Sequence, residues 1–273
     1  MDINSPEIQA LKAKVRAADE EFAFAQECHE TWKPAAYDIQ LHERIGYSYV
    51  ANAFNLIRLA LRREMVLGLM RLWDKDKRTV DMQSIANALS DTRIVDALAS
   101  NYAAFWTSLE PPNLRDIPEY LRSEFTELIS AHEKKFGQEQ GNKLRERASE
   151  AVSIIRKYQK DGSGYRTLDR LRDLRNERLA HRNVTQPTPT EVATPIPSDE
   201  EIEIFYKDMA ELIRLLLVVV HQTDYRPDDT AKIHAKNAAY FWASVRGERT
   251  EGHPNYQAPS SRSQHSPDGK KVP

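Results

Sequence analysis

The chain of 273 residues has one cysteine, nine glycines and no marked excess of either charge. Because Cys28 is alone, an intrachain disulfide and a thiolate metal cluster are both excluded, and a reducing cytoplasm is the expected location. So few glycines argue against the many tight turns of an all-β fold. The formal net charge is −2, so any contact with a nucleic acid has to come from a local basic patch.

Long apolar runs are also missing. The most apolar run is LLLVVV at 215–220, far shorter than the roughly 20 residues that cross a bilayer. The first residues, MDINSPEIQALKAK, are polar and contain no apolar signal core. We therefore expect a cytoplasmic protein without a membrane partner. The glycine-rich motifs that bind ATP or dinucleotides are absent as well.

Histidine patterns typical of metal sites are incomplete. Three pairs begin like the zinc-binding HExxH helix motif: His29–Glu30, His42–Glu43 and His132–Glu133. The fifth position of each is a residue that cannot replace the second histidine: Lys33, Gly46 and Phe136, respectively. His221 and Asp224 are spaced for a metal or an ion pair, but a helix-end histidine beside a turn aspartate is much commoner. We expect no metal and no cofactor.

Apolar residues recur at helical spacing along most of the chain. The expected helices span about 6–32, 39–73, 81–90, 91–109, 119–160, 165–183, 198–221 and 228–246. Gly137 and Gly141 are expected to break the segment 119–160 into two helices. No strand pattern is found, so the predicted fold is all-α, a bundle of long antiparallel helices without a sheet. The tryptophans are expected in its core: Trp32, Trp73, Trp106 and Trp242.

The expected domain organisation is simple. Residues 1–246 form a single helical domain, and the polar, proline-dotted segment 247–273 forms a disordered tail. Within the domain, four prolines make 184–197 an irregular surface loop. Ser198 and Glu201 are spaced as a capping box that opens the following helix.

Residues 165–183, YRTLDRLRDLRNERLAHRN, form the most unusual of the expected helices. Leucines and cations share one broad face: Leu168, Leu171, Leu174, Arg175, Arg178, His181 and Arg182. Carboxylates form a stripe on the opposite side: Asp169, Asp173 and Glu177. Burying unpaired cations costs several kcal/mol each, so this face is not ordinary core. In the alternative interpretation, the arginines pair with the acidic stripe on a solvated helix, and His181 is a C-terminal cation favoured by the helix dipole.

This pattern resembles a known signature. Arg175, Asn176, the spacer Glu177–Ala180 and His181 resemble the Arg–His motif of the HEPN superfamily. The wider sequence LRDLRNERLAHRN resembles the branch first named from the abortive-infection U systems of bacteria. A second segment, MRLWDKDKRTVDMQSIANAL at 70–89, resembles an earlier segment of the same branch. The resemblance covers about residues 5–225 and implies a HEPN-type helical bundle.

The resemblance also implies an activity. HEPN ribonucleases are typically dimers that cleave RNA without metal, by attack of a ribose 2′-hydroxyl on the neighbouring phosphate. Arg175, His181 and Asn176 are the expected catalytic residues, and a permanent guanidinium and an imidazole suit phosphate binding and proton transfer. Three further arginines of the helix are expected to bind RNA: Arg172, Arg178 and Arg182. Glu177 is expected to orient His181.

On an ideal helix Arg175 and His181 lie about 120° apart, so one copy of the motif does not enclose a target. Two copies that face each other across a two-fold axis do, which favours a homodimer. The expected role is a toxin-like effector of antiphage defence, with RNA as substrate and an inhibitory or sensor protein as a possible further partner. No DNA partner is expected.

Two alternatives remain at this point. One is a non-catalytic HEPN module that binds RNA, a nucleotide or a protein, and the other is an inert scaffold that assembles through the leucine face. Some HEPN proteins carry a tyrosine two residues after the histidine, where a partner nucleotidyltransferase modifies them. Asn183 occupies that position here, which argues against that toxin–antitoxin arrangement.

Overall fold

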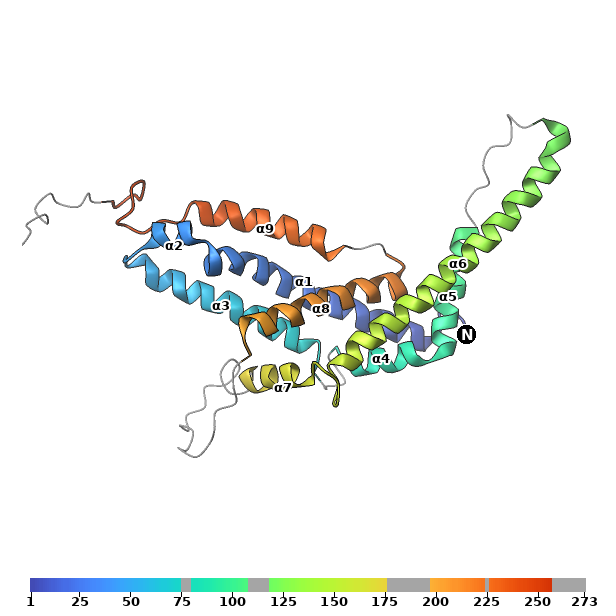
Figure 1. The fold of residues 1–273 in the computed structure, drawn as a ribbon, viewed down its shortest axis with the longest axis horizontal. Coiled ribbons are helices and arrows are strands. Elements are labelled where there is room, and N and C mark those ends of the chain that lie inside the picture. The colour runs from blue at the N-terminus through green and yellow to red at the C-terminus, as the bar shows by residue number, and fades with distance from the viewer. Residues whose placement is uncertain (75–79, 108–117, 176–196, 224–225, 257–273) are drawn as a thin grey trace, which may run out of the picture. The chain divides into compact units, whose positions relative to one another are not determined.

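A computed structural model describes residues 1–74, 80–107, 118–175, 197–223 and 226–256. In these ranges the backbone forms helices and turns, and no strand (Figure 1). The helices are α1 (Pro6–Tyr37), α2 (Ile39–Ile45), α3 (Val50–Arg71), α4 (Met82–Ser90), α5 (Thr92–Thr107), η2 (Glu119–Leu121), α6 (Arg122–Lys157), α7 (Tyr165–Leu174), α8 (Asp199–Leu216), the π-helical turn η4 (Leu217–His221) and α9 (Pro227–Ala243). The all-α prediction is confirmed.

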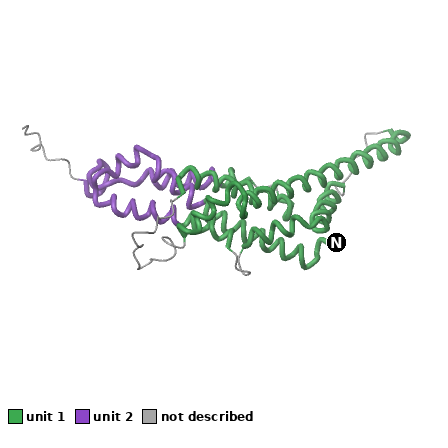
Figure 2. The backbone as a smooth tube through the Cα atoms, turned by 60° about the horizontal axis from the view of Figure 1, so that its bottom comes forward, with its two compact units in different colours: residues 1–26, 64–230 green, residues 27–63, 231–273 purple. Residues whose placement is uncertain are grey.

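The chain divides into two compact units, coloured separately in Figure 2. Unit 1 comprises residues 1–26 and 64–230, and unit 2 comprises residues 27–63 and 231–273. The helices α1, α3 and α9 each contribute residues to both units. Both units contain residues of the range 1–246, so the interpretation of this range as one domain stays a prediction.

The core of unit 1 is built around α6, which packs against α4, α5 and α8. Its inward face repeats at helical spacing and is fully buried at Leu144, Ala148 and Ile155. The apolar run 215–220 is also buried in this unit. None of the helices in the described ranges combines the length and the apolar character that a membrane crossing requires.

Unit 2 has its own core of α1, α2, α3 and α9 residues around Trp242. The Trp242 ring meets Phe54 edge to face at 5.6 Å, and its indole N–H donates to the Thr31 carbonyl at 2.8 Å. The first residues of the predicted disordered tail belong to this unit and form a hydrogen bond with it. The Gly247 N–H donates to the Arg44 carbonyl at 2.9 Å, so residues 247–256 are placed, and residues 257–273 lie outside the described ranges.

The predicted break at Gly137 and Gly141 is wrong, because α6 runs without interruption through both. These glycines mark a close helix contact instead. A Cβ on Gly137 would lie 2.9 Å from the Ala103 carbonyl oxygen, and one on Gly141 would lie 3.2 Å from that of Ala99. The missing side chains therefore let the backbones of α5 and α6 approach each other.

Two other helix boundaries differ from the prediction. The segment 39–73 is split after Ile45, because Gly46 takes a positive φ of 50° that ends α2. Conversely, α1 continues past Pro34 to Tyr37, with the Asp38 N–H donating to the Pro34 carbonyl at 2.9 Å. Ala35, buried in the core of unit 2, lies on this last turn.

The tryptophan prediction is confirmed for three of the four residues. Trp32, Trp73 and Trp242 are buried. Trp106 is only half-buried, because it lies near the end of α5 at the rim of a cavity.

Candidate functional site

The structure places two of the predicted site residues, Arg172 and Arg175. The others lie outside the described ranges: Asn176, Glu177, Arg178, His181 and Arg182. The described part of the site consists of α7, Arg175 at its end and the residues of unit 1 around them.

The start of α7 is fixed by a tight turn after α6. Asp161 adopts a left-handed conformation with φ of 74°, and the Gly164 N–H donates to the Lys157 carbonyl at 2.8 Å. A Cβ on Gly164 would lie 2.5 Å from Cε1 of Tyr158. Only glycine lets the Tyr158 ring pack against the first turn of α7. The segment 161–164 between the two helices is a tightly packed corner.

The inward face of α7 matches the predicted leucine stripe. Leu168 and Leu171 are buried, and Leu174 is half-buried. Arg166 and Asp169 on the outer side are exposed, and Arg172 is partly exposed. The change from buried leucine to partly buried cation begins at Arg175, where the motif starts.

Arg170 connects α7 to the beginning of α8. Its guanidinium is ion-paired with Glu201, which also accepts a hydrogen bond from the Ser198 N–H at 2.8 Å. The Ser198 hydroxyl in turn accepts from the Glu201 N–H at 3.2 Å, which confirms the capping box. The backbone hydrogen bond from Ser198, followed by the hydrogen bond and charge of Arg170, lowers the pKa of Glu201. Glu201 thus remains ionised and holds α7 against α8.

Arg175 is ion-paired with Asp74, which follows the last turn of α3. Both side chains are about three-quarters buried, at 26% and 29% exposed. The two sequence segments that carry the family resemblance, 70–89 and 175–183, therefore meet at this contact. The carboxylate paired with Arg170 comes from α8, and Asp74, paired with Arg175, lies just after α3.

An aromatic cluster holds the residue next to Asp74. The Trp73 ring lies 5.8 Å from Tyr158 and 6.5 Å from Phe205, and these two rings meet edge to face at 4.9 Å. The Trp73 indole N–H donates to the Met209 sulfur at 3.4 Å. Because Trp73 is fixed on several sides, the backbone position of Asp74 is fixed as well.

Tyr158, Lys157 and Asp208 form a polar group beside this cluster. The Tyr158 hydroxyl and the Lys157 ammonium both donate to Oδ2 of Asp208, each at 2.5 Å. Burial, followed by the hydrogen bond and charge of Asp208, raises the pKa of the Tyr158 phenol well above its usual range. Tyr158 therefore stays neutral and acts as a donor that fixes Asp208, not as a proton acceptor.

Sequence reasoning missed this polar group and the partner of Arg175. In the sequence, Tyr158 occupies an apolar position of a helical pattern, and Asp208 lies 50 residues further along the chain. No short spacing joins Asp74 to Arg175 either, which are 101 residues apart. The one available signal was that both segments resembled parts of the same family.

The described part of the site can present a fixed cation to an anionic group. A guanidinium offers planar donors that match phosphate oxygens, and its charge does not depend on pH. Asp74 compensates this charge in the absence of a ligand, so that Arg175 is not buried as an isolated cation.

Comparison with known proteins identifies the family. The family model HEPN_AbiU2, described as AbiU2, matches residues 8–241, which include both segments and every described helix from α1 to most of α9. No curated protein and no solved structure matches the chain. The chain therefore belongs to the AbiU2 family, an abortive-infection family of HEPN type.

Proposed function

We propose that this chain is a HEPN endoribonuclease that cleaves RNA without metal at a site composed of two copies, and that it acts as a toxin-like effector of antiphage defence. The observation that carries the proposal is the position of Arg175. It is held by Asp74 at the end of α7, directly before Asn176, and His181 follows six residues later in a chain of the AbiU2 family.

Each motif residue suits one part of the reaction. The ribose 2′-hydroxyl attacks the adjacent phosphate, and the products are a 2′,3′-cyclic phosphate and a 5′-hydroxyl. His181 transfers a proton, because an imidazole with an ordinary pKa of about 6.5 exists in both forms near neutrality. Arg175 stabilises the charge that builds on the phosphate oxygens. Asn176 orients the histidine or the substrate, while Arg172, Arg178 and Arg182 bind the RNA backbone.

Asp74 acts on the reaction through Arg175. A free arginine side chain samples many rotamers, and fixing it before substrate arrives removes part of the entropy loss from the binding step. The aromatic cluster around Trp73 holds Asp74 in turn. Asp74 is therefore a positioning residue for the arginine of the motif.

The spacing of the motif supports a dimer. On an ideal helix, residues spaced like Arg175 and His181 lie about 120° apart. A phosphate bound to one of them then meets the other only when a second copy faces the first. The composite site thus joins Arg175 of one chain to His181 of the other.

Cleavage of single-stranded RNA by purified protein in EDTA tests the proposal. We expect wild type to release fragments that end in a 2′,3′-cyclic phosphate. Substitution His181→Ala should lower the rate at least about 100-fold, the usual contribution of a general acid or base. Arg166→Ala, an exposed arginine of the same helix, is the matched control and should cleave like wild type.

Two results together would overturn the enzyme proposal. Wild type would cleave no RNA under any condition, and His181→Ala would behave like wild type in phage-infected cells. Circular dichroism and sedimentation of each variant show whether its helices and oligomeric state are preserved.

The ion pair between Arg175 and Asp74 favours a second candidate function. An arginine whose charge is balanced by a carboxylate can also bind an anionic ligand without taking part in catalysis. In that case the same basic face holds RNA, a nucleotide or a partner protein and has a regulatory role. RNA binding that persists without product, and that is lost in Arg175→Ala but not in His181→Ala, would identify this function. Affinity that falls steeply with salt would show contact with phosphates.

A further inference from the structure

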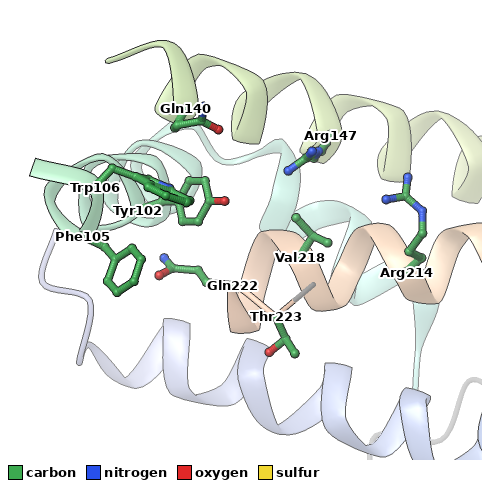
Figure 3. Close-up of a pocket in the computed structure, with 9 residues that line it drawn as sticks. All are labelled: Tyr102, Phe105, Trp106, Gln140, Arg147, Arg214, Val218, Gln222 and Thr223. Carbon is green, nitrogen blue, oxygen red and sulfur yellow. The ribbon is translucent and has the colours of Figure 1, made fainter. Parts of the chain in front are cut away.

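A cavity of about 360 Å³ lies in unit 1 between α5, α6 and the segment formed by α8 and η4 (Figure 3). None of its lining residues belongs to the candidate site described above. Aromatic side chains of α5 line one end and two arginines line the other. The lining includes Tyr102, Phe105, Trp106, Arg147, Arg214 and Gln222.

The aromatic end is built around Trp106. Its ring meets Tyr102 at right angles at 6.0 Å and Phe105 at 5.5 Å, and Phe136 of α6 supports it at 5.4 Å. The indole Nε1 is buried and has no hydrogen-bond partner among the described residues. A buried donor without an acceptor costs about 1–3 kcal/mol. The ring contacts with Tyr102, Phe105 and Phe136 hold Trp106 in place despite this cost.

The opposite end carries the positive charge. Arg214 is ion-paired with Glu211 on its own helix, Nε and one terminal nitrogen donating at 2.8 and 2.6 Å. Arg147 of α6 is half-buried and has no ion-pair partner within the described ranges. One guanidinium charge therefore faces the cavity without a described carboxylate to compensate it. An anionic group of a ligand fits there.

The remaining wall is formed by a strained turn. The α8 helix ends in the π-helical turn η4, and Gln222 after it has a positive φ of 57°. The side-chain amide of Gln222 makes two hydrogen bonds to α5. Its oxygen accepts from Asn101 at 3.2 Å, and its nitrogen donates to the Leu98 carbonyl at 3.4 Å. π-Turns and left-handed residues that are not glycine concentrate at functional sites. The turn keeps this wall at a fixed distance from the aromatic end.

We propose that this cavity binds a mononucleotide, with the base against Trp106 and Tyr102 and the phosphate on Arg147. Its volume lies in the range of about 300–1,000 Å³ that is usual for small-molecule sites. A base has a flat face for the aromatic end, while a phosphate satisfies the guanidinium. Stacking of a base on an aromatic side chain contributes about 1–3 kcal/mol. The site does not depend on RNA cleavage at the α7 motif.

Calorimetry with the full chain tests the proposal, with AMP, GMP, CMP and UMP as ligands and adenosine and inorganic phosphate as partial ligands. At least one mononucleotide should bind, and its isolated nucleoside and phosphate should bind at least tenfold more weakly. Arg147→Gln should weaken nucleotide binding at least tenfold. Arg145→Gln is the matched control, because this arginine lies on the same helix and pairs with Asp96 outside the cavity.

The role of Trp106 is tested separately. Trp106→Phe keeps an aromatic ring for the base, so it should weaken binding less than Trp106→Leu, which removes the ring. Circular dichroism shows whether each variant folds, and the phenylalanine variant keeps the test valid when the leucine variant does not fold.

Three outcomes would overturn the proposal. The first is that none of the four mononucleotides binds to wild type at millimolar concentration. The second is equal binding to wild type and to Arg147→Gln. The third is binding that survives in Arg147→Gln but disappears in Arg175→Ala, which would place the nucleotide at the α7 motif.

Discussion

Asp74 is the residue on which the placement of Arg175 depends. Asp74→Asn removes the charge and keeps the shape, so we expect the kcat of RNA cleavage to fall about tenfold or more with a smaller change in KM, because a misplaced guanidinium binds the transition state less well. Asp74→Glu should recover part of the loss. Single-turnover and steady-state kinetics provide the measurement.

Asp169→Asn is the control for the Asp74 variants, because Asp169 is an exposed carboxylate on α7. If Asp74→Asn and Asp169→Asn cleave RNA at the same rate, Asp74 has no positioning role. An equal loss of stability and activity in Asp74→Asn would indicate a purely structural ion pair.

His221 makes the stability of unit 1 depend on pH. Burial is the main cause that lowers its pKa, with the charges of Arg16 and Lys12 acting in the same direction. The hydrogen bond to the Lys12 carbonyl, at 3.1 Å, and the charge of Asp19 oppose it. In the unfolded chain its pKa is about 6.5. The folded state thus favours the neutral ring.

The sign of the effect follows from proton binding. Below about pH 6.5 the unfolded chain binds a proton that the folded chain resists, so this contribution to stability is complete above that pH and declines as the pH falls. We expect His221→Gln, which keeps a donor for the Lys12 carbonyl, to lose less stability than wild type between pH 7.5 and 5.5. Urea unfolding at both pH values measures this difference. An equal loss in the two proteins would contradict the prediction.

The glycines of α6 allow close contact with α5 and do not end the helix. Gly137→Ala adds a Cβ that would lie 2.9 Å from the Ala103 carbonyl oxygen and 2.8 Å from Cγ2 of Thr107. Alanine favours an isolated helix by about 1 kcal/mol, but overpacking a helix contact costs about 1–3 kcal/mol. We therefore expect a lower melting temperature and faster amide exchange in α5.

Ser130→Ala is the comparison for Gly137→Ala, because Ser130 is an exposed interior position of the same helix and tests propensity alone. This variant should be as stable as wild type or slightly more stable. If Gly137→Ala were also stabilising, the two helices would not be in close backbone contact in solution.

The sequence predicted the helices better than their ends and contacts. Periodicity identified every described α-helix of about 10 residues or more, and the Ser198–Glu201 spacing identified the capping box. Periodicity cannot tell a glycine that ends a helix, such as Gly46, from one that admits a neighbour, such as Gly137, because the difference lies in the partner element. Likewise, the apolar pattern that placed Trp73 in the core placed Trp106 there as well, although Trp106 lines a cavity.

For the candidate site as well, the sequence predicted the residue types but not their contacts. The motif and the family resemblance drew attention to Arg175 from the sequence alone, because the residue types are chemically informative at short spacing. Its partner Asp74 and the Tyr158–Asp208 hydrogen bond join residues 50 or more positions apart, and such pairings follow from tertiary packing.

A composite site predicts complementation between two inactive variants. In a dimer of one Arg175→Ala chain and one His181→Ala chain, one site lacks both residues and the other is intact. Co-refolding equal amounts makes half the dimers mixed, so recovery should reach about a quarter of wild-type RNA cleavage. Each variant alone should remain inactive.

The absence of recovery has two separate meanings. If sedimentation shows that both variants are dimers, the arginine and histidine of a site come from one chain. If wild type is a monomer at all concentrations, the composite site itself is wrong.

The buried position of Cys28 has a practical consequence. It is the one thiol of the chain and is enclosed in the protein, so reagents that modify exposed thiols will leave it largely untouched under native conditions. A cysteine introduced at the exposed Arg166 would then take up a nitroxide selectively. Pulsed electron paramagnetic resonance on that single label would report how far apart two α7 helices lie in an assembly, without a crystal.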